Sequence, residues 1–346
     1  MKITQVTCLA AWLVAATQPA LHAQNAPEIR GNPYLPVSGL LEWPSDRAAS
    51  QPDLTEARSN RVYDLHMDMG DCRHLEFILS TAGNWHPALM DYWFDRFMRK
   101  QRPKSYLITT TPPVALEQHE EQYFGMGNVS LRCQPHIAVG PKALMEALQK
   151  AGITVGEPVP LFTTRGNVLL VQKGNPKNIR TLHDLGRSDV RTVTPHPERE
   201  GGSFRLYTNT IYAITYHAFG KEKADTLFSE IFNRNDSSWV AGQRIHHREV
   251  PELIARGEGD VGVIFYQLAR YVCELFPDQF DMVPLGGGVQ APDPLPGNPQ
   301  LTLYALRLTG ELTERQASMR EAFFEEIEKG KMDKYLRRHH LIPAER

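Results

Sequence analysis

The sequence has few cysteines and almost no excess charge of either sign. Four cysteines occur in 346 residues, and none falls in a CxxC or other zinc-type spacing, so neither a disulfide-rich scaffold nor a cysteine-held zinc ion is expected. Lysine and arginine number 38 against 40 acidic residues, for a formal net charge of -2. The chain therefore lacks the basic surface that a nucleic acid or an anionic membrane would require, and no nucleic-acid partner is expected.

Signatures of catalysis are also missing. GxSxG does not occur, and no Cys–His pair stands in a recognisable setting, so nothing favours nucleophilic catalysis. GxxxxGK[ST] is absent too, which excludes a P-loop ATPase. We expect no catalytic residue and no cofactor, and we predict that the chain is not an enzyme.

Apolar runs long enough to span a bilayer are absent as well. Residues 6–14 form a short apolar run that follows Lys2 and leads to small residues ending at Ala23. This pattern predicts a cleaved signal peptide over residues 1–23 and an exported protein in a bacterial periplasm, with a membrane anchor as the alternative. Three cysteines then remain, so at most one disulfide can form: Cys72 with Cys133 is one pairing, and buried free thiols are the alternative.

Strands and helices alternate through most of the remaining chain. Residues 24–73 are rich in Pro, Ser, Asp and Arg and predict an irregular N-terminal extension. Beyond it, apolar runs bounded by Gly and Pro predict strands, and apolar positions at helical spacing predict helices. We expect strands at 75–80, 105–108, 134–139, 168–171, 190–193, 261–266, 282–285 and 301–306, and helices at 88–98, 114–122, 142–151, 180–185, 205–219, 252–256, 313–329 and 333–340. Such alternation is typical of an α/β fold with mainly parallel sheets flanked by helices.

Polar loops follow several of these strands, where ligands bind in open α/β folds. Thr81 and Asn84 follow the first strand, Thr110 and Thr111 follow the second, and His196 precedes a helix that begins near two glycines. Hydroxyl and amide groups there, with the backbone N–H groups of the helix starts, could hold an anion. The plainer interpretation is that the threonines are ordinary strand and cap residues.

Histidines near these loops raise the question of a metal. His86, His196 and His247 could converge on a divalent transition metal, but adjacent histidines on a strand point to opposite faces, so His246 and His247 would not share one ion. The alternative is that they act as neutral imidazoles in hydrogen bonds. No metal site is predicted.

Three segments resemble the second lobe of type II periplasmic solute-binding proteins, most closely the branch that binds molybdate and tungstate. They are residues 167–184 (NVLLVQKGNPKNIRTLHD), 194–197 (TPHP) and 257–263 (GEGDVGV). The resemblance covers about residues 75–271. It departs from the branch where molybdate binders place a serine after the first strand and Ser-Gly after the second, because residues 81–84 are TAGN and 110–112 are TTP.

The resemblance implies a two-lobe type II fold with a hinged cleft. We expect lobe 1 at 74–165 plus 270–346 and lobe 2 at 166–269. The implied function is capture of a small anion, either an oxyanion such as molybdate or tungstate or a small organic anion, for the permease of an ABC importer. The implied ligand residues are Thr81, Asn84, Thr110, Thr111, His196, Arg248 and Tyr266, and the protein is expected to be a monomer.

Two alternatives remain open. The same fold could serve as the periplasmic input domain of a membrane sensor, which differs only in its partner. A secreted metal-binding or metal-dependent protein could instead use His86, His196 and His247. For Arg248, a surface or interlobe salt bridge is the alternative to a ligand contact.

Overall fold

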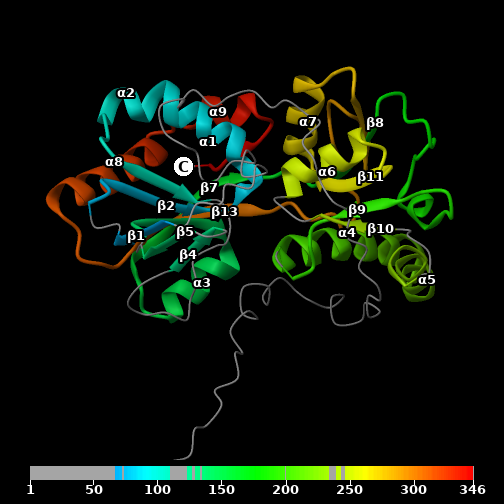
Figure 1. Ribbon diagram of the computed structural model, residues 1–346, viewed down its shortest axis with the longest axis horizontal. Helices are drawn as coiled ribbons and strands as arrows, with labels where there is room; N and C mark the ends of the chain where they lie inside the picture. The colour runs from blue at the N-terminus through cyan, green and yellow to red at the C-terminus, as the bar shows by residue number, and fades with distance from the viewer. Residues whose placement is uncertain are drawn as a thin grey trace, which may run out of the picture.

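The computed structural model describes residues 67–71, 74–109, 123–126, 129–132, 135–198, 200–233, 239–242 and 246–345. Within this part of the chain, helices and strands form two lobes that lie side by side (Figure 1). The expected signal peptide, Thr110, Thr111 and the helix expected at 114–122 lie outside the described residues. Cys72 and Cys133 lie outside them too, so their pairing stays a prediction, and Cys273 is a free thiol.

A six-stranded sheet forms the centre of the first lobe, in the order β14-β7-β13-β6-β2-β3. Its strands are β2 (Phe77–Thr81), β3 (Tyr106–Thr109), β6 (Ile137–Pro141), β7 (Thr154–Thr163), β13 (Thr302–Leu308) and β14 (Ile342–Pro343). One face packs against α1 (His86–Tyr92), η5 (Trp93–Phe97), α2 (Met98–Gln101), α8 (Glu314–Glu328) and α9 (Asp333–Arg338). The other face packs against α3 (Lys142–Lys150). The C-terminal helices therefore complete the lobe that the first strands begin (Figure 1).

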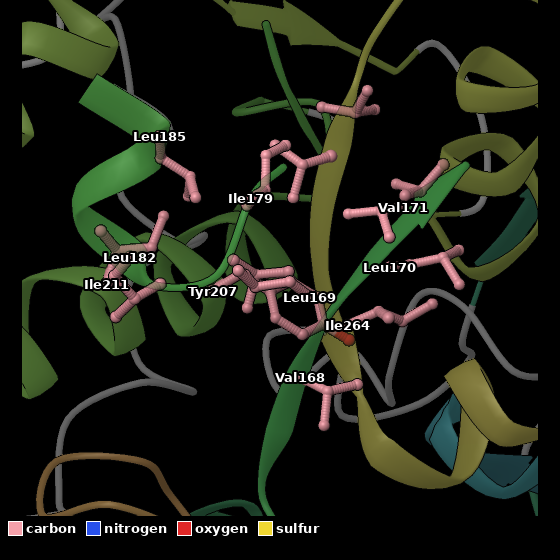
Figure 2. Packing of buried hydrophobic residues seen from close by; sticks show 14 of the residues in the cluster. Val168, Leu169, Leu170, Val171, Ile179, Leu182, Leu185, Tyr207, Ile211 and Ile264 are labelled. Carbon is pink, nitrogen blue, oxygen red and sulfur yellow. The ribbon is translucent and has the colours of Figure 1, made fainter. Parts of the chain in front are cut away.

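A five-stranded sheet forms the centre of the second lobe, in the order β10-β9-β11-β8-β12. Its strands are β8 (Asn167–Gln172), β9 (Thr192–Thr194), β10 (Trp239–Ala241), β11 (Val261–Phe265) and β12 (Phe280–Pro284). The helices are η6 (Leu182–Gly186), α4 (Gly201–Phe219), α5 (Lys221–Phe232), α6 (His246–Ala255) and α7 (Tyr266–Leu275). Val168 to Val171 of β8 are all buried among side chains from both faces, which explains their continuous apolar run (Figure 2).

A three-stranded sheet of β1 (Met67–Asp71), β5 (Val129–Arg132) and β4 (Tyr123–Met126) is also present. β1 pairs in parallel with β5, and β5 pairs antiparallel with β4. Residues 67–71 were expected to belong to the irregular extension, and that expectation was wrong for these five residues. Long-range strand pairing supplies order that their local sequence does not indicate.

Both large sheets are mixed. Parallel ladders join β2 to β3 and β6, and β9 to β10 and β11, whereas β8 and β13 run antiparallel to both of their neighbours. The two-lobe α/β fold with helix-covered sheets is therefore confirmed, but parallel pairing is confined to part of each sheet. β8 and β13 are the strands by which the chain enters a lobe from the other one, which explains their reversed direction.

Two chain segments connect the lobes. Residues 164–166 lead from β7 to β8, and residues 285–301 lead back from β12 to β13. They are joined by hydrogen bonds, because Thr164 N donates to Leu301 O (2.9 Å) and Leu301 N donates to Thr164 Oγ1 (2.8 Å). Asn298 adds two more by accepting from Asn167 N (2.7 Å) and donating to Asn167 O (2.9 Å). A paired crossing of this kind can act as a hinge.

The second sheet extends past the lobe boundary expected at residue 269. β12 pairs antiparallel with β8 from Phe280 to Pro284, and Val272 of α7 packs in the second core. The expectation that residues 270–346 all belong to lobe 1 was therefore wrong for β12. The apolar run at 282–285 would suit a strand in either sheet, so the sequence alone could not assign it.

Several local expectations also change. His246 and His247 lie on α6 and not on a strand, so the argument that placed them on opposite faces of a strand was wrong. The helix expected at 180–185 is the 3-10 turn η6, which has a capping box of Thr181 and Asp184. β7, β10, α5 and α7 were not expected. Among the helices in the described ranges, none has the length and apolar character needed to cross a membrane.

Candidate functional site

The loop that leaves β2 is held by the side chain of Thr81. Its Oγ1 accepts a hydrogen bond from Trp85 Nε1 (2.7 Å) and lies 3.3 Å from Ala82 O, to which it donates. Trp85 is itself buried in the core of the first lobe. Both capacities of the Thr81 hydroxyl are thus used within its own loop, where it positions the start of η4 (Gly83–Trp85) and α1.

Two hydroxyls lie next to each other at the ends of β2 and β3. Ser80 and Thr109 are register partners in the parallel ladder, so their side chains share one face of the sheet. Both residues are buried, and neither hydroxyl has a hydrogen-bond partner. Thr109 directly precedes Thr110 and Thr111, which the sequence indicated as candidates, but Ser80 was missed because it looked like the last residue of an ordinary strand.

His196 and His246 are buried in the second lobe. His196 Nδ1 accepts from Glu198 N (3.0 Å), which shapes the loop before α4. His246 Nε2 lies 3.0 Å from Val263 O, and its ring lies 4.4 Å from the ring of Tyr207. Burial lowers the pKa of His246 to about 3, so its imidazole is neutral and Nε2 carries the proton donated to the carbonyl.

An acidic residue lies between the starts of α4 and α6. Glu200 immediately precedes α4, and its Oε2 accepts from His246 N (2.9 Å). Burial is the main cause that raises the pKa of Glu200 to about 8, and the nearby carboxylate of Glu249 adds to it. Glu200 is therefore mostly protonated at neutral pH and adds little negative charge to this region. The sequence signal that could have indicated it is an acid directly before a Gly-Gly helix start.

α6 carries more buried charge than a lobe core usually contains. Arg248, Glu249 and Glu252 are all buried on this helix. A Cβ on Gly242 would lie 2.5 Å from Glu249 Oε2, so the glycine is what lets this carboxylate approach the backbone after β10. Arg248 was expected to be either a ligand residue or part of a surface or interlobe salt bridge, and its burial excludes the surface position alone.

The lobes touch through η4, α1, α6 and α7. Gln267 Nε2 on α7 donates to Asn84 O on η4 (2.9 Å), and both side chains are buried. The rings of His86 and His247 stack across the same junction, with centroids 6.3 Å apart and planes inclined by 25°. The expected residues Asn84, His86 and His247 are thus brought together from opposite lobes.

Tyr266 lies beside Gln267 at the start of α7. Its hydroxyl donates to Val289 O (2.9 Å), in the segment that returns to the first lobe. The hydroxyl proton is therefore used in this contact, and only its oxygen lone pairs could meet a ligand. Gln267 was not among the expected residues, because a helix at 266–275 was not recognised in the sequence.

The histidines do not form a metal site in the described part of the chain. No group of three or more His, Cys, Asp or Glu side chains there is arranged to hold an ion. His86 and His247 meet as a pair, and His196 does not join them in such a group. Burial above all, and then the charge of Arg248 and the neighbouring His86, lower the pKa of His247 well below its usual range. This supports a neutral imidazole at the junction.

Comparison with known proteins places the chain in a family. The sequence model of the family described as bacterial extracellular solute-binding protein matches residues 136–315, just over half of the chain. The chain belongs to this family. The resemblance to type II solute-binding proteins is thereby confirmed, while the molybdate and tungstate branch is not specifically supported.

Curated relatives match over a shorter stretch. The thiosulfate-binding protein of Escherichia coli is 36% identical over 107 residues, 31% of this chain and 30% of that protein. The sulfate-binding protein of Salmonella typhimurium is 31% identical over 118 residues, 34% of this chain and 35% of that protein. The chain thus matches about a third of the length of these relatives. Both are binding proteins, which agrees with the prediction that this chain is not an enzyme.

Solved structures share the fold. The sulfate-binding protein SubI from Mycobacterium tuberculosis superimposes with a TM-score of 0.54 at 15% identity, covering 78% of this chain and 86% of that one. AgtB from Agrobacterium tumefaciens R10, in complex with agropinic acid, has a TM-score of 0.52 at 12% identity, covering 80% and 84%. At these identities the likeness supports the two-lobe fold alone.

Proposed function

We propose that this protein is a periplasmic solute-binding protein that captures a small anion between its lobes and delivers it to the permease of an ABC importer. The observation that carries the proposal is the lobe junction, where polar side chains of both lobes meet. Asn84 and His86 of the first lobe face Gln267 and the half-buried His247 of the second, and the buried Arg248 is close enough to influence His247. Solute-binding proteins place their ligand at such a junction and close around it.

The family and its curated relatives favour an oxyanion. The partial relatives are named for thiosulfate and sulfate, which makes these anions the first candidates, with molybdate, tungstate and small carboxylates next. Arg248 is a buried cation on α6 that could face an anion, and Glu200 adds little negative charge because it is mostly protonated at neutral pH, although Glu249 and Glu252 are also buried on α6. Hydroxyls of Ser80 and Thr109 and backbone N–H groups at the start of α4 would supply neutral donors.

Binding would use no covalent chemistry. The paired connections at Thr164 and Leu301 would rotate, and the ligand would stabilise the closed arrangement in which the Gln267–Asn84 hydrogen bond forms. The residues expected from the sequence fall into two groups in this scheme. Asn84 and Arg248 would face the ligand, whereas Thr81, His196 and Tyr266 would position the loops that do so. Thr110 and Thr111 lie outside the described residues and stay expected ligand residues.

A ligand screen tests the proposal. The protein without residues 1–23 would be heated in the presence of sulfate, thiosulfate, molybdate, tungstate, phosphate or small carboxylates. An anion at one hundred times its Kd should stabilise the fold by about 2.7 kcal/mol, which gives a clear rise in Tm. Isothermal titration would then show one site per chain. An unchanged Tm with every anion would overturn the proposal. A rise in Tm with Zn²⁺, Cu²⁺ or Ni²⁺ alone would overturn it and favour the metal-binding alternative.

Substitution of Arg248 locates the site. Arg248→Met should weaken anion binding by about tenfold or more, because it removes a charge-assisted hydrogen bond from a buried position. Arg248→Lys keeps the charge and should recover part of the affinity. Arg256→Met is the matched control. Arg256 directly follows the last residue of α6, and its guanidinium pairs with Glu258. Equal weakening by both methionine variants would show that Arg248 does not contact the anion.

A further inference from the structure

Gln267 presents a buried acceptor at the lobe junction. Its Nε2 donates to the backbone carbonyl of Asn84 (2.9 Å), and its Oε1 has no hydrogen-bond partner. The whole residue is 3% exposed. Because Oε1 and Nε2 are bonded to the same carbon, the unpartnered oxygen lies at the junction together with the nitrogen that crosses it.

The orientation of this amide is fixed by its surroundings. A carbonyl oxygen can only accept, so the group that faces Asn84 O must be the NH₂ of Gln267. A rotation of the amide by half a turn would set two oxygens against each other. Oε1 is therefore an acceptor that needs a donor, and burial without one costs free energy.

A second acceptor lies on the opposite lobe. Asn84 Oδ1 is buried and has no partner, and it belongs to the residue whose backbone Gln267 contacts. Ser80 Oγ and Thr109 Oγ1, at the ends of the neighbouring strands, are also without partners, but hydroxyls can adapt to either kind of ligand. Gln267 Oε1 is the group that discriminates, because its orientation is fixed and it cannot donate, whereas a half-turn of the Asn84 amide would present a donor in place of its oxygen.

We infer that the ligand carries a hydrogen-bond donor of its own, which Gln267 Oε1 accepts. The inference rests on the proposed anion-binding function and names a class within it: a hydrogen oxyanion such as HPO₄²⁻, or a hydroxy acid. Sulfate, thiosulfate and molybdate have only acceptor oxygens, and they would set lone pairs against Oε1. A site built around a particular hydrogen bond discriminates against an analogue that cannot form it.

Matched anions test this directly. HPO₄²⁻ and sulfate have the same shape and charge but differ by one P–OH donor, and glycolate and acetate differ by one hydroxyl. Titration calorimetry at about pH 8 should show the donor-bearing member of a pair binding about 5- to 150-fold more tightly, the range expected for leaving one buried acceptor unpaired.

The variants identify Gln267 as the cause. Gln267→Met removes the acceptor, so most of the preference within each pair should disappear. Gln267→Glu retains an oxygen acceptor of the same size but sets its second oxygen against Asn84 O and adds a negative charge, so its overall affinity should fall while the preference is kept. Gln172→Met is the matched control, because Gln172 Nε2 donates to Ile254 O (2.8 Å) inside the second lobe and takes no part in the junction.

The outcomes separate the two proposals. A preference for donor-bearing anions that survives in Gln172→Met and collapses in Gln267→Met supports the inference. Sulfate binding as tightly as HPO₄²⁻, or a preference unchanged in Gln267→Met, would overturn it and leave the anion-binding function standing. Failure of every anion to bind the unmodified protein would overturn the proposed function as well.

Discussion

Two glutamates, one in each lobe, show how a partner decides the charge of an acid that is shielded from solvent: Glu326 is buried and Glu200 is half-buried. Glu326 on α8 of the first lobe receives hydrogen bonds from Arg96 and from Lys100 (2.7 Å). Burial alone would raise its pKa, but these two cations outweigh burial and hold the pKa below its usual value. Glu200 in the second lobe has the N–H of His246 as a donor and Glu249 as a charged neighbour, and its pKa rises to about 8.

The difference separates a structural acid from one beside the candidate site. Glu326 stays ionised and connects α8 to the helices after β2, so its charge stabilises the first lobe. Glu200 stays mostly neutral, so it adds little to the negative charge that Glu249 already places between the starts of α4 and α6. The two lobes therefore respond to pH in opposite directions at these positions.

The largest expected effect is at Glu326. Glu326→Gln should reduce the free energy of unfolding by about 1–3 kcal/mol at neutral pH, because it removes charge-assisted hydrogen bonds at a side chain that is 2% exposed. A lowered native pKa means that this stabilisation is present above the unfolded pKa of glutamate and is lost as pH falls through the native one. The difference between variant and parent in urea unfolding should thus shrink in acid.

Glu325→Gln controls for this change. Glu325 is the preceding residue on α8 and pairs with Lys329 at the surface. Its loss should have no measurable effect on urea unfolding, because exposed i,i+4 pairs contribute little. If Glu325→Gln destabilised the protein as much as Glu326→Gln, the assigned role of burial would be wrong.

A smaller effect of opposite sign is expected at Glu200. Its native pKa is above the unfolded one, so its penalty is absent below about pH 4.5 and grows as pH rises through about 8. Glu200→Gln keeps the acceptor for His246 N and removes the charge. It should stabilise the protein by about 1 kcal/mol at alkaline pH, less than the raised pKa alone implies because Glu200 is only half-buried, and leave its stability near pH 4.5 unchanged.

Urea unfolding across this pH range checks the prediction. Glu198→Gln is the control, since Glu198 is an exposed acid in the same loop. If the free energy of unfolding of Glu200→Gln changed with pH in the same way as that of the parent between pH 4.5 and 9, the raised pKa of Glu200 would be contradicted.

Much of the fold could be predicted from local sequence. The apolar run at 168–171 is buried on both faces, and Thr313, whose side chain accepts from Gln316 N, caps the helix expected at 313–329. Elements that depend on long-range pairing could not be predicted in this way. β12 is assigned to the second lobe only by its ladder with β8, and the order in β1 comes from pairing with β5.

The candidate site was predicted less completely, for a related reason. Asn84, His86 and His247 were recognised as polar residues near strand ends, and the structure brings them to one junction. Gln267 was missed because the strand and the helix after it run together as one apolar stretch. Thr81 was recognised, but the sequence could not show that its hydroxyl accepts a hydrogen bond from Trp85 Nε1. Partners on other elements decide which polar groups remain available.

The smallest effect is expected at an exposed ion pair. It joins an acid to a base, as Glu326 is joined to Arg96 and Lys100, but both of its side chains are exposed. Lys173 Nζ lies 2.9 Å from Asp281 Oδ1, and the two side chains are 52% and 40% exposed. Asp281 also accepts from Gly174 N (2.8 Å), a bond that does not need the lysine. Lys173→Met should therefore leave urea unfolding unchanged at neutral pH, because water solvates the remaining carboxylate and screens the pair. A clear destabilisation would mean that pairing itself, and not burial, separates the two glutamates.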